Sequence, residues 1–217
     1  MPGTFITFEG IDGSGKSTQL RLLNNFLRAN GLNPLITREP GGTPVGLRLR
    51  AALLDATEEV DPLTELLVFA ADRAQHVRRV IRPALESGLV VISDRYADAT
   101  IAYQGAGRGF PPDLIAEIVQ LATEGLKPDL TVLFDVSIEE STNRTTRRGT
   151  GKSAASKMGR DRLDVETAEF HARVRDAYLE IARAEPERVK VVDASGPVEQ
   201  TQEQVKSIVV PYLKTRT

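Results

Sequence analysis

The chain has 217 residues, the length of one ordinary domain, and its 41% hydrophobic and 27% charged residues are typical of a globular protein in water. The net charge of −2 argues against nucleic-acid binding by an overall basic field, and no apolar run approaches the ~18 residues that a membrane span needs. The absence of cysteine excludes disulfides, thiolate metal sites and a cysteine nucleophile. The first residues lack the basic and apolar segments of a signal peptide, and we expect a cytoplasmic protein.

Short β-branched segments alternate with longer helical patterns, which predicts parallel strands joined by helices. The expected strands, in chain order, are Thr4–Phe8, Pro34–Thr37, Leu89–Ile92, Leu130–Phe134 and Val189–Val192. Helical patterns cover about 16–30, 45–55, 62–87, 112–125, 138–148, 164–184 and 197–214. We therefore predict one α/β domain over residues 1–217, with a five-stranded parallel sheet flanked by helices.

A glycine-rich segment follows the first strand, and a helical pattern begins at Lys16. Residues Gly10–Ser17 match the P-loop template Gly-x4-Gly-Lys-Ser in full and in its strand–loop–helix context. Backbone N–H groups and the helix N-terminus would bind phosphates, Lys16 adds a positive charge, and Ser17 offers a hydroxyl to Mg²⁺. A glycine-rich turn without a ligand is the alternative. A similar segment, Gly149–Ser153, lacks the preceding strand and the first glycine, and we do not count it as a phosphate site.

The expected helix from Pro62 carries Phe69 and Arg73 four residues apart, along one flank of its apolar stripe. A flat ring beside a planar donor suits the face and the edge of a nucleobase. A core phenylalanine with an arginine that extends to solvent fits the same spacing.

Asp94 and Arg95 follow the third strand, at the edge of the sheet where α/β proteins bind ligands. Asp94 would hold Mg²⁺ opposite Ser17, and Arg95 can bind a phosphate with paired hydrogen bonds. A structural ion pair is the alternative. If a helix begins after Tyr96, then Thr100, Tyr103 and Gln104 share a face and offer groups that suit a base and a sugar.

A basic, glycine-rich segment follows the fourth strand, and its composition predicts a mobile lid over about 145–162. The basic residues of this segment, together with Arg144 just before it, are Arg144, Arg147, Arg148, Lys152, Lys157, Arg160 and Arg162. A charge run is usually a solvated surface. Beside a P-loop it favours a lid that closes over two phosphates, because a phosphate acceptor needs cations more than a general base.

These motifs together resemble the thymidylate kinase family, over nearly the whole chain. The matching segments are FEGIDGSGKSTQ at 8–19, TREPGGTPVG at 37–46, LLVFAADRAQH at 66–76, SDRYADATIAYQG at 93–105, PDLTVLFDV at 128–136, DRLDVE at 161–166 and DASGPVE at 193–199. The resemblance implies a P-loop NTPase fold of the nucleoside monophosphate kinase type. It implies phosphoryl transfer from ATP to dTMP with Mg²⁺, and a homodimer.

For the acceptor, the resemblance implies that Phe69 stacks on thymine and Arg73 bonds its carbonyl edge. Thr100 and Gln104 would read the remaining edge, and Tyr103 would lie against the sugar.

For the chemistry, the resemblance implies that Arg95 binds the dTMP phosphate and that Asp12 lies near the sugar 3′-hydroxyl and orients arginines. Arg144 would stack on adenine, and Arg148 or Arg160 would act on the transferring phosphoryl group, beside Lys16. The expected ATP-binding residues are Gly10, Ile11, Asp12, Gly13, Ser14, Gly15, Lys16, Ser17, Thr18 and Arg144.

Two positions distinguish this chain within the resemblance. Some members carry arginine where this chain has Gly13, and glycine there together with a basic lid indicates the bacterial type. Asp164 stands where the family usually has glutamate, and Glu166 is the neighbouring acid that could share its role.

Other classes of function fit the sequence less well. Another P-loop kinase, acting on a different nucleotide or a deoxynucleoside, is the nearest alternative. A GTPase would need an Asn-Lys-x-Asp segment, which is absent. A non-catalytic nucleotide-binding module would be expected to have lost some of Lys16, Ser17, Asp94 and Arg95.

Overall fold

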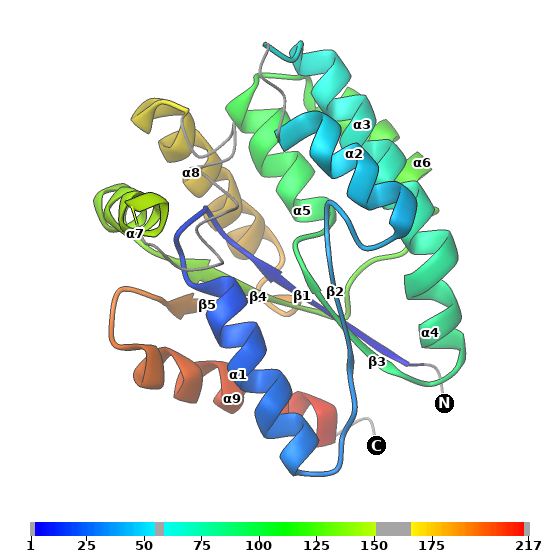
Figure 1. Ribbon diagram of the computed structural model, residues 1–217, viewed down its shortest axis with the longest axis vertical. Coiled ribbons are helices and arrows are strands. Elements are labelled where there is room, and N and C mark those ends of the chain that lie inside the picture. Colours follow the sequence, from blue (N-terminus) through cyan, green and yellow to red (C-terminus); the bar gives the residue numbers. More distant parts are fainter. Residues whose placement is uncertain (1–2, 55–58, 151–165, 215–217) are drawn as a thin grey trace.

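The centre of the molecule is a parallel sheet of five strands in the order β2-β3-β1-β4-β5, as seen in the computed structural model (Figure 1). The structure describes residues 3–54, 59–150 and 166–214, with the backbone alone for 148–150. The strands are β1 (Thr4–Glu9), β2 (Leu35–Arg38), β3 (Val90–Asp94), β4 (Leu130–Asp135) and β5 (Val189–Asp193). The predicted five-stranded parallel sheet is confirmed.

Helices cover both faces of this sheet, as parallel strands require. They are α1 (Lys16–Ala29), α2 (Pro44–Leu54), α3 (Pro62–His76), η1 (Val77–Ile81), α4 (Arg82–Glu86), α5 (Ala97–Thr100), η2 (Ile101–Gly107), α6 (Pro112–Thr123), α7 (Ile138–Thr150), α8 (Ala168–Ala184) and α9 (Val198–Lys214). Figure 1 shows α1 and α9 together on one face, while α3, α5 and α8 lie on the other. No described helix is both long and apolar enough to cross a membrane.

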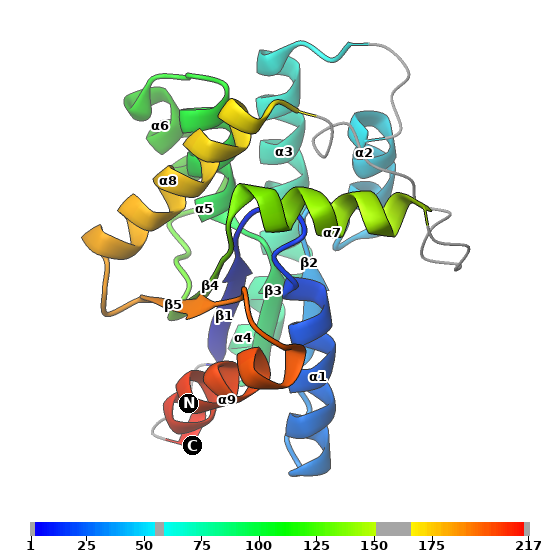
Figure 2. The same ribbon diagram turned by 90° about the vertical axis from the view of Figure 1, so that its left-hand side faces the viewer.

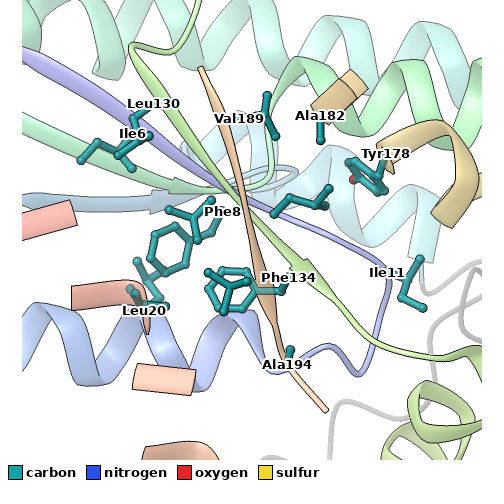
Figure 3. Packing of buried hydrophobic residues seen from close by; sticks show 14 of the residues in the cluster. Ile6, Phe8, Ile11, Leu20, Leu130, Phe134, Tyr178, Ala182, Val189 and Ala194 are labelled. Atoms are coloured by element: carbon teal, nitrogen blue, oxygen red, sulfur yellow. The ribbon is translucent and has the colours of Figure 1, made fainter. Parts of the chain in front are cut away.

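The largest core cluster contains residues of β1, β4 and α1 and extends to α8 and α9. Phe8 and Phe134 have ring centroids 5.0 Å apart, and they pack with Leu20 of α1 (Figure 3). Phe5 instead packs against Tyr96 at 4.8 Å, with residues of η1 and β3. Alternate residues of β1 therefore serve the two faces of the sheet, which orients the residues at its carboxyl end.

The predicted helix over 62–87 is a helical run with a wider π-helical turn, η1, in its middle. Asp61 caps the start of α3, because its carboxylate accepts hydrogen bonds from the N–H groups of Leu63 and Thr64. Pro83 lacks the N–H that would bond the carbonyl of Arg79, and the wider turn accommodates its ring. A second π-helical turn, η2, completes the helix that begins at Ala97.

The predicted helix over about 138–148 is α7, and it continues to Thr150, so residues 145–150 of the segment assigned to the lid are helical. Thr145 is buried, and its hydroxyl donates to the carbonyls of Ser141 and Thr142, which satisfies this buried polar group within the helix. Residues 151–162 of the predicted lid lie outside the described residues. Helix α8 begins at Ala168 rather than near 164, because the Thr167 hydroxyl caps it by accepting from the N–H of Phe170.

Candidate active site

The P-loop, Gly10–Ser17, joins β1 to α1 beside α7 (Figure 2). Gly10, Gly13 and Gly15 have φ values of 136°, 75° and 93°, which side chains rarely adopt. A Cβ on Gly10 would lie 2.5 Å from the carbonyl oxygen of Phe134. The glycines thus give the backbone of an anion-binding loop at the start of a helix.

Lys16 folds back over this loop. Its ammonium donates to the carbonyl oxygens of Gly10 at 2.8 Å and Ile11 at 2.9 Å. Burial, and then the charge of Arg95, lowers the pKa of Lys16 to about 8, although Asp12 opposes this shift. A phosphate in the loop would offer Lys16 a charged acceptor in place of neutral carbonyls.

The expected magnesium ligands lie together. The Ser17 hydroxyl donates to Asp94 Oδ2 at 2.8 Å, across the gap between α1 and β3. Serine and carboxylate oxygens suit Mg²⁺, which takes its remaining ligands from water and substrate phosphates. The pair therefore fits the ion that accompanies a nucleoside triphosphate.

Asp12 connects the P-loop to the residues after β3. Arg95 Nη2 donates to Asp12 Oδ1 at 2.5 Å, and the Tyr103 hydroxyl donates to Asp12 Oδ2 at 2.8 Å. The guanidinium of Arg95 also lies 4.7 Å from the centre of the Tyr103 ring. Burial alone would raise the pKa of Asp12, but Arg95 and Lys16 hold it below its ordinary range. Asp12 is therefore an anion that positions Arg95.

Arg95 occupies a backbone conformation that is rare outside glycine, with φ of 72°. The Arg95 N–H donates to the carbonyl of Phe8 at 2.9 Å, and the Ser93 hydroxyl donates to the Arg95 carbonyl at 2.8 Å. The next N–H, of Tyr96, donates to Glu9 Oε1 at 2.7 Å. These bonds hold the turn in its strained form, and the guanidinium then points toward Asp12.

Some of the residues expected to contact the nucleobase lie in contact with one another. Arg73 Nη1 donates to the Thr100 hydroxyl at 2.7 Å, and Arg73 Nε donates to Glu39 Oε2 at the same distance. Phe69 is half-buried one turn earlier on α3. Gln104 donates to Glu65 Oε1 at 2.9 Å, and no described bond joins it to Arg73 or Thr100.

Comparison with known proteins identifies the family of the chain that carries this site. The family model for thymidylate kinase matches residues 8–205. A thymidylate kinase of Desulfovibrio desulfuricans is 47% identical over 213 residues, covering 98% of this chain and 97% of the relative. A thymidylate kinase of Pelobacter propionicus is 48% identical over 215 residues, covering 99% of this chain and 95% of the relative. The chain belongs to the thymidylate kinase family.

A solved structure agrees with this family. The crystal structure of thymidylate kinase from Ehrlichia chaffeensis is similar with a TM-score of 0.75 and 33% identity, covering 96% of this chain and 99% of that chain. The predicted P-loop NTPase fold and the predicted family membership are confirmed, and the family is one of phosphotransferases. The roles of single residues stay predictions.

The residues that the family resemblance assigns to the lid are only partly described. Arg144 Nε pairs with Glu140 at 2.8 Å on the same face of α7, and Arg144 Nη2 lies 3.5 Å from the carbonyl of Ser195. The side chain of Arg148 lies outside the described residues, as do Arg160 and Asp164. Glu166 pairs with Arg108 at 2.6 Å.

Buried carboxylates in the site were missed by sequence reasoning. Glu9 ends β1 and Glu39 follows β2, at the same edge of the sheet as Asp94, so the rule that selected Asp94 could have found them. Glu39 accepts a hydrogen bond from Arg73 Nε, and its other carboxylate oxygen lies 2.9 Å from His76 Nδ1. Glu65 gave no signal, because an acid in the first turn of a helix is usual.

Proposed function

We propose that this chain transfers the γ-phosphoryl group of ATP to dTMP, giving ADP and dTDP. The observation that carries the proposal is the bridge from Asp12 of the P-loop to Arg95, since it sets a phosphate-binding arginine beside the triphosphate cradle. The second pKa of a monophosphate is ~6, so an ionised dTMP oxygen can attack the γ-phosphorus without a general base. The bond from the γ-phosphorus to the bridging oxygen of ADP breaks as the new bond forms.

The donor side is assigned to the P-loop and α7. Backbone N–H groups of residues 10–18 and the ammonium of Lys16 bind the phosphates of ATP, and Arg144 stacks on adenine. Ser17 and Asp94 would hold the Mg²⁺ that accompanies ATP, which would supply positive charge beside the phosphates. Asp12 holds Arg95, which binds the dTMP phosphate, beside the P-loop through their 2.5 Å contact.

The acceptor side is assigned to α3, α5 and η2. Arg73 has five N–H donors, of which three bond Glu39, Thr100 and the Tyr96 carbonyl, so further donors can bond a thymine carbonyl. Phe69 stacks on the base. Tyr103, fixed by Asp12 at 2.8 Å, lies against the sugar and disfavours a ribose 2′-hydroxyl.

A coupled assay of ADP release tests this reaction, with Mg-ATP and dTMP, dUMP, dCMP, dAMP, dGMP, UMP or AMP. We expect strong preference for dTMP. Preference for another monophosphate would keep the phosphate chemistry and discard the base site. No turnover with any acceptor would indicate a hydroxyl acceptor or a binding module.

The lid arginines have their own test. Changing both Arg148 and Arg160 to alanine should slow the phosphoryl-transfer step by about a hundredfold or more, because each neutralises charge in the transition state. Binding of dTMP should change much less. Single-turnover rates and equilibrium dTMP binding separate the effects, and an unchanged single-turnover rate would show that these arginines take no part in the chemistry.

A further inference from the structure

Glu65 is a fully buried carboxylate in the first turn of α3, next to the residues assigned to the base. Its side chain is 0% exposed. Gln104 Nε2 donates to Glu65 Oε1 at 2.9 Å. Arg108 donates through Nε to Oε1 at 3.2 Å and through Nη2 to Oε2 at 3.0 Å. Glu65 therefore connects a residue assigned to the base with the partly buried guanidinium of Arg108.

The chemistry of this contact fixes the orientation of the Gln104 amide. A carboxylate paired with arginine has acceptor oxygens and no donor, whereas a glutamine amide has a donor end and an acceptor end. Gln104 must therefore turn its NH₂ group toward Glu65. Its carbonyl oxygen then points away from Glu65, and the hydrogen bond that the described residues show for the Gln104 amide is the one its NH₂ group donates to Glu65.

Arg108 keeps Glu65 in the state that this orientation needs. Its guanidinium lies 4.7 Å from the ring centre of Phe170 and also pairs with Glu166 at 2.6 Å. Arginine stays protonated in proteins, so the carboxylate beside it is held as an acceptor. A neutral Glu65 could donate to Gln104 and let its amide turn over.

We propose that Glu65 is a specificity-positioning residue, which makes Gln104 present a carbonyl oxygen to the acceptor base. The inference rests on the proposed function, in which Gln104 reads the base. A carbonyl oxygen accepts a hydrogen bond from N3–H of thymine or uracil. N3 of cytosine is itself an acceptor, so it forms no hydrogen bond with this carbonyl oxygen. Glu65 therefore disfavours binding of dCMP without contacting it.

The test is Glu65→Gln, with kcat/KM measured for dTMP, dUMP and dCMP. A glutamine at 65 can meet Gln104 with either its oxygen or its NH₂ group, so the Gln104 amide is no longer held in one orientation. We expect the ratio of kcat/KM for dTMP to that for dCMP to fall about tenfold. The dTMP to dUMP ratio should not change, because both bases carry N3–H. Loss of stability alone would not move one ratio and spare the other.

Glu166→Gln is the matched control, because it makes the same chemical change at the other carboxylate that pairs with Arg108. It leaves the bond between Glu65 and Gln104 intact, so its dTMP to dCMP ratio should stay at the wild-type value. An equal fall in both variants would overturn the inference.

Gln104→Met separates this inference from the proposed base site. If Gln104→Met leaves the dTMP to dCMP ratio unchanged, Gln104 does not read the base and that part of the proposed function fails. If Gln104→Met lowers the ratio and a folded Glu65→Gln does not, only the role of Glu65 is overturned. Thermal melting checks that each variant is folded.

A second variant covers the case in which Glu65→Gln does not fold. Changing Glu65 and Arg108 together to methionine removes both charges of this pair, a replacement that proteins often tolerate, and the carboxylate that also loses Arg108, Glu166, is partly exposed. Gln104 again loses the acceptor that orients it. We expect the same selective fall, and an unchanged dTMP to dCMP ratio would overturn the inference.

Discussion

Glu9 ends β1 with its carboxylate fully buried among the residues that support Arg95. It accepts from the Tyr96 N–H at 2.7 Å and from the Tyr178 hydroxyl at 2.8 Å. Burial and then the charge of Asp98 raise the pKa of Glu9 from 4.5 to about 7, although Arg95 and the hydrogen bonds oppose this shift. Glu9 thus supports the strained turn at some electrostatic cost.

This cost predicts a pH dependence of stability. Between pH 4.5 and about 7 the folded protein binds a proton at Glu9 that the unfolded chain has released, so stability falls as pH rises through this window. The difference between 4.5 and about 7 corresponds to on the order of 3 kcal/mol. Glu9→Gln keeps an acceptor for Tyr96 and a donor for the Tyr178 oxygen, and it cannot ionise.

Urea unfolding at pH 5 and pH 8 measures this effect. The free energy of unfolding should fall less in Glu9→Gln than in the unchanged protein between these values. An identical fall in both proteins would show that Glu9 does not titrate in this range. The other groups facing Glu9 are Asp98, Arg95, Lys16 and Tyr178, and all four are present in both proteins that are compared.

At the scale of elements, α7 packs directly on the P-loop (Figure 2). The Ser141 hydroxyl donates to the carbonyl of Asp12 at 2.6 Å. A Cβ on Gly13 would lie 2.6 Å from the Ser141 carbonyl oxygen, and Gly13 also has φ of 75°. The position at which other members carry a P-loop arginine is therefore closed by α7 in this chain.

Gly13→Ala should destabilise the protein by about 2–4 kcal/mol and raise KM for ATP, because α7 must move off the loop. Gly15→Ala is the control, since its φ of 93° imposes similar backbone strain but nothing lies within 4 Å of the added Cβ. Its loss of stability should be smaller by about 1 kcal/mol or more. Denaturant unfolding compares the two, and equal losses would contradict a clash with α7.

The residues at the ends of the strands explain why the hydropathy pattern predicted the sheet but only part of the site. Every described strand ends on a charged residue: Glu9, Arg38, Asp94, Asp135 and Asp193. The sequence pattern ended each strand before this charged residue, one or two positions too early. Charged residues continue these strands because the carboxyl edge of a parallel sheet faces the ligand site. Hydropathy therefore found the sheet and missed Glu9.

At the scale of the whole molecule, α2 and α3 lie side by side and expose several large apolar residues (Figure 1). These are Val45 at 47%, Leu47 at 49%, Leu63 at 48% and Leu67 at 52% exposure. An apolar surface on neighbouring helices is typical of a contact between copies. We propose this surface as the interface of the expected homodimer.

If the expected homodimer forms through this surface, Leu67→Glu should lower the measured mass to that of a monomer, because it places a charge at the centre of an apolar contact. Sedimentation equilibrium measures the mass of each form. Leu89→Glu, at a residue 43% exposed and distant from α2 in sequence and fold, is the control and should remain a dimer. A dimer that survives Leu67→Glu unaltered would exclude this surface as the interface.

The sequence alone determined the strands, most helices and the P-loop, because hydrophobic period, proline, glycine and capping residues act over a few neighbours. It also predicted that Ser17 and Asp94 lie close together, since both lie near the carboxyl ends of parallel strands, at one edge of the sheet. Only the tertiary structure decided that Glu9 supports the Arg95 turn and that Glu65 orients Gln104. These contacts join residues 87 and 39 positions apart. Burial, which gives such carboxylates their effect, arises only when distant segments pack together.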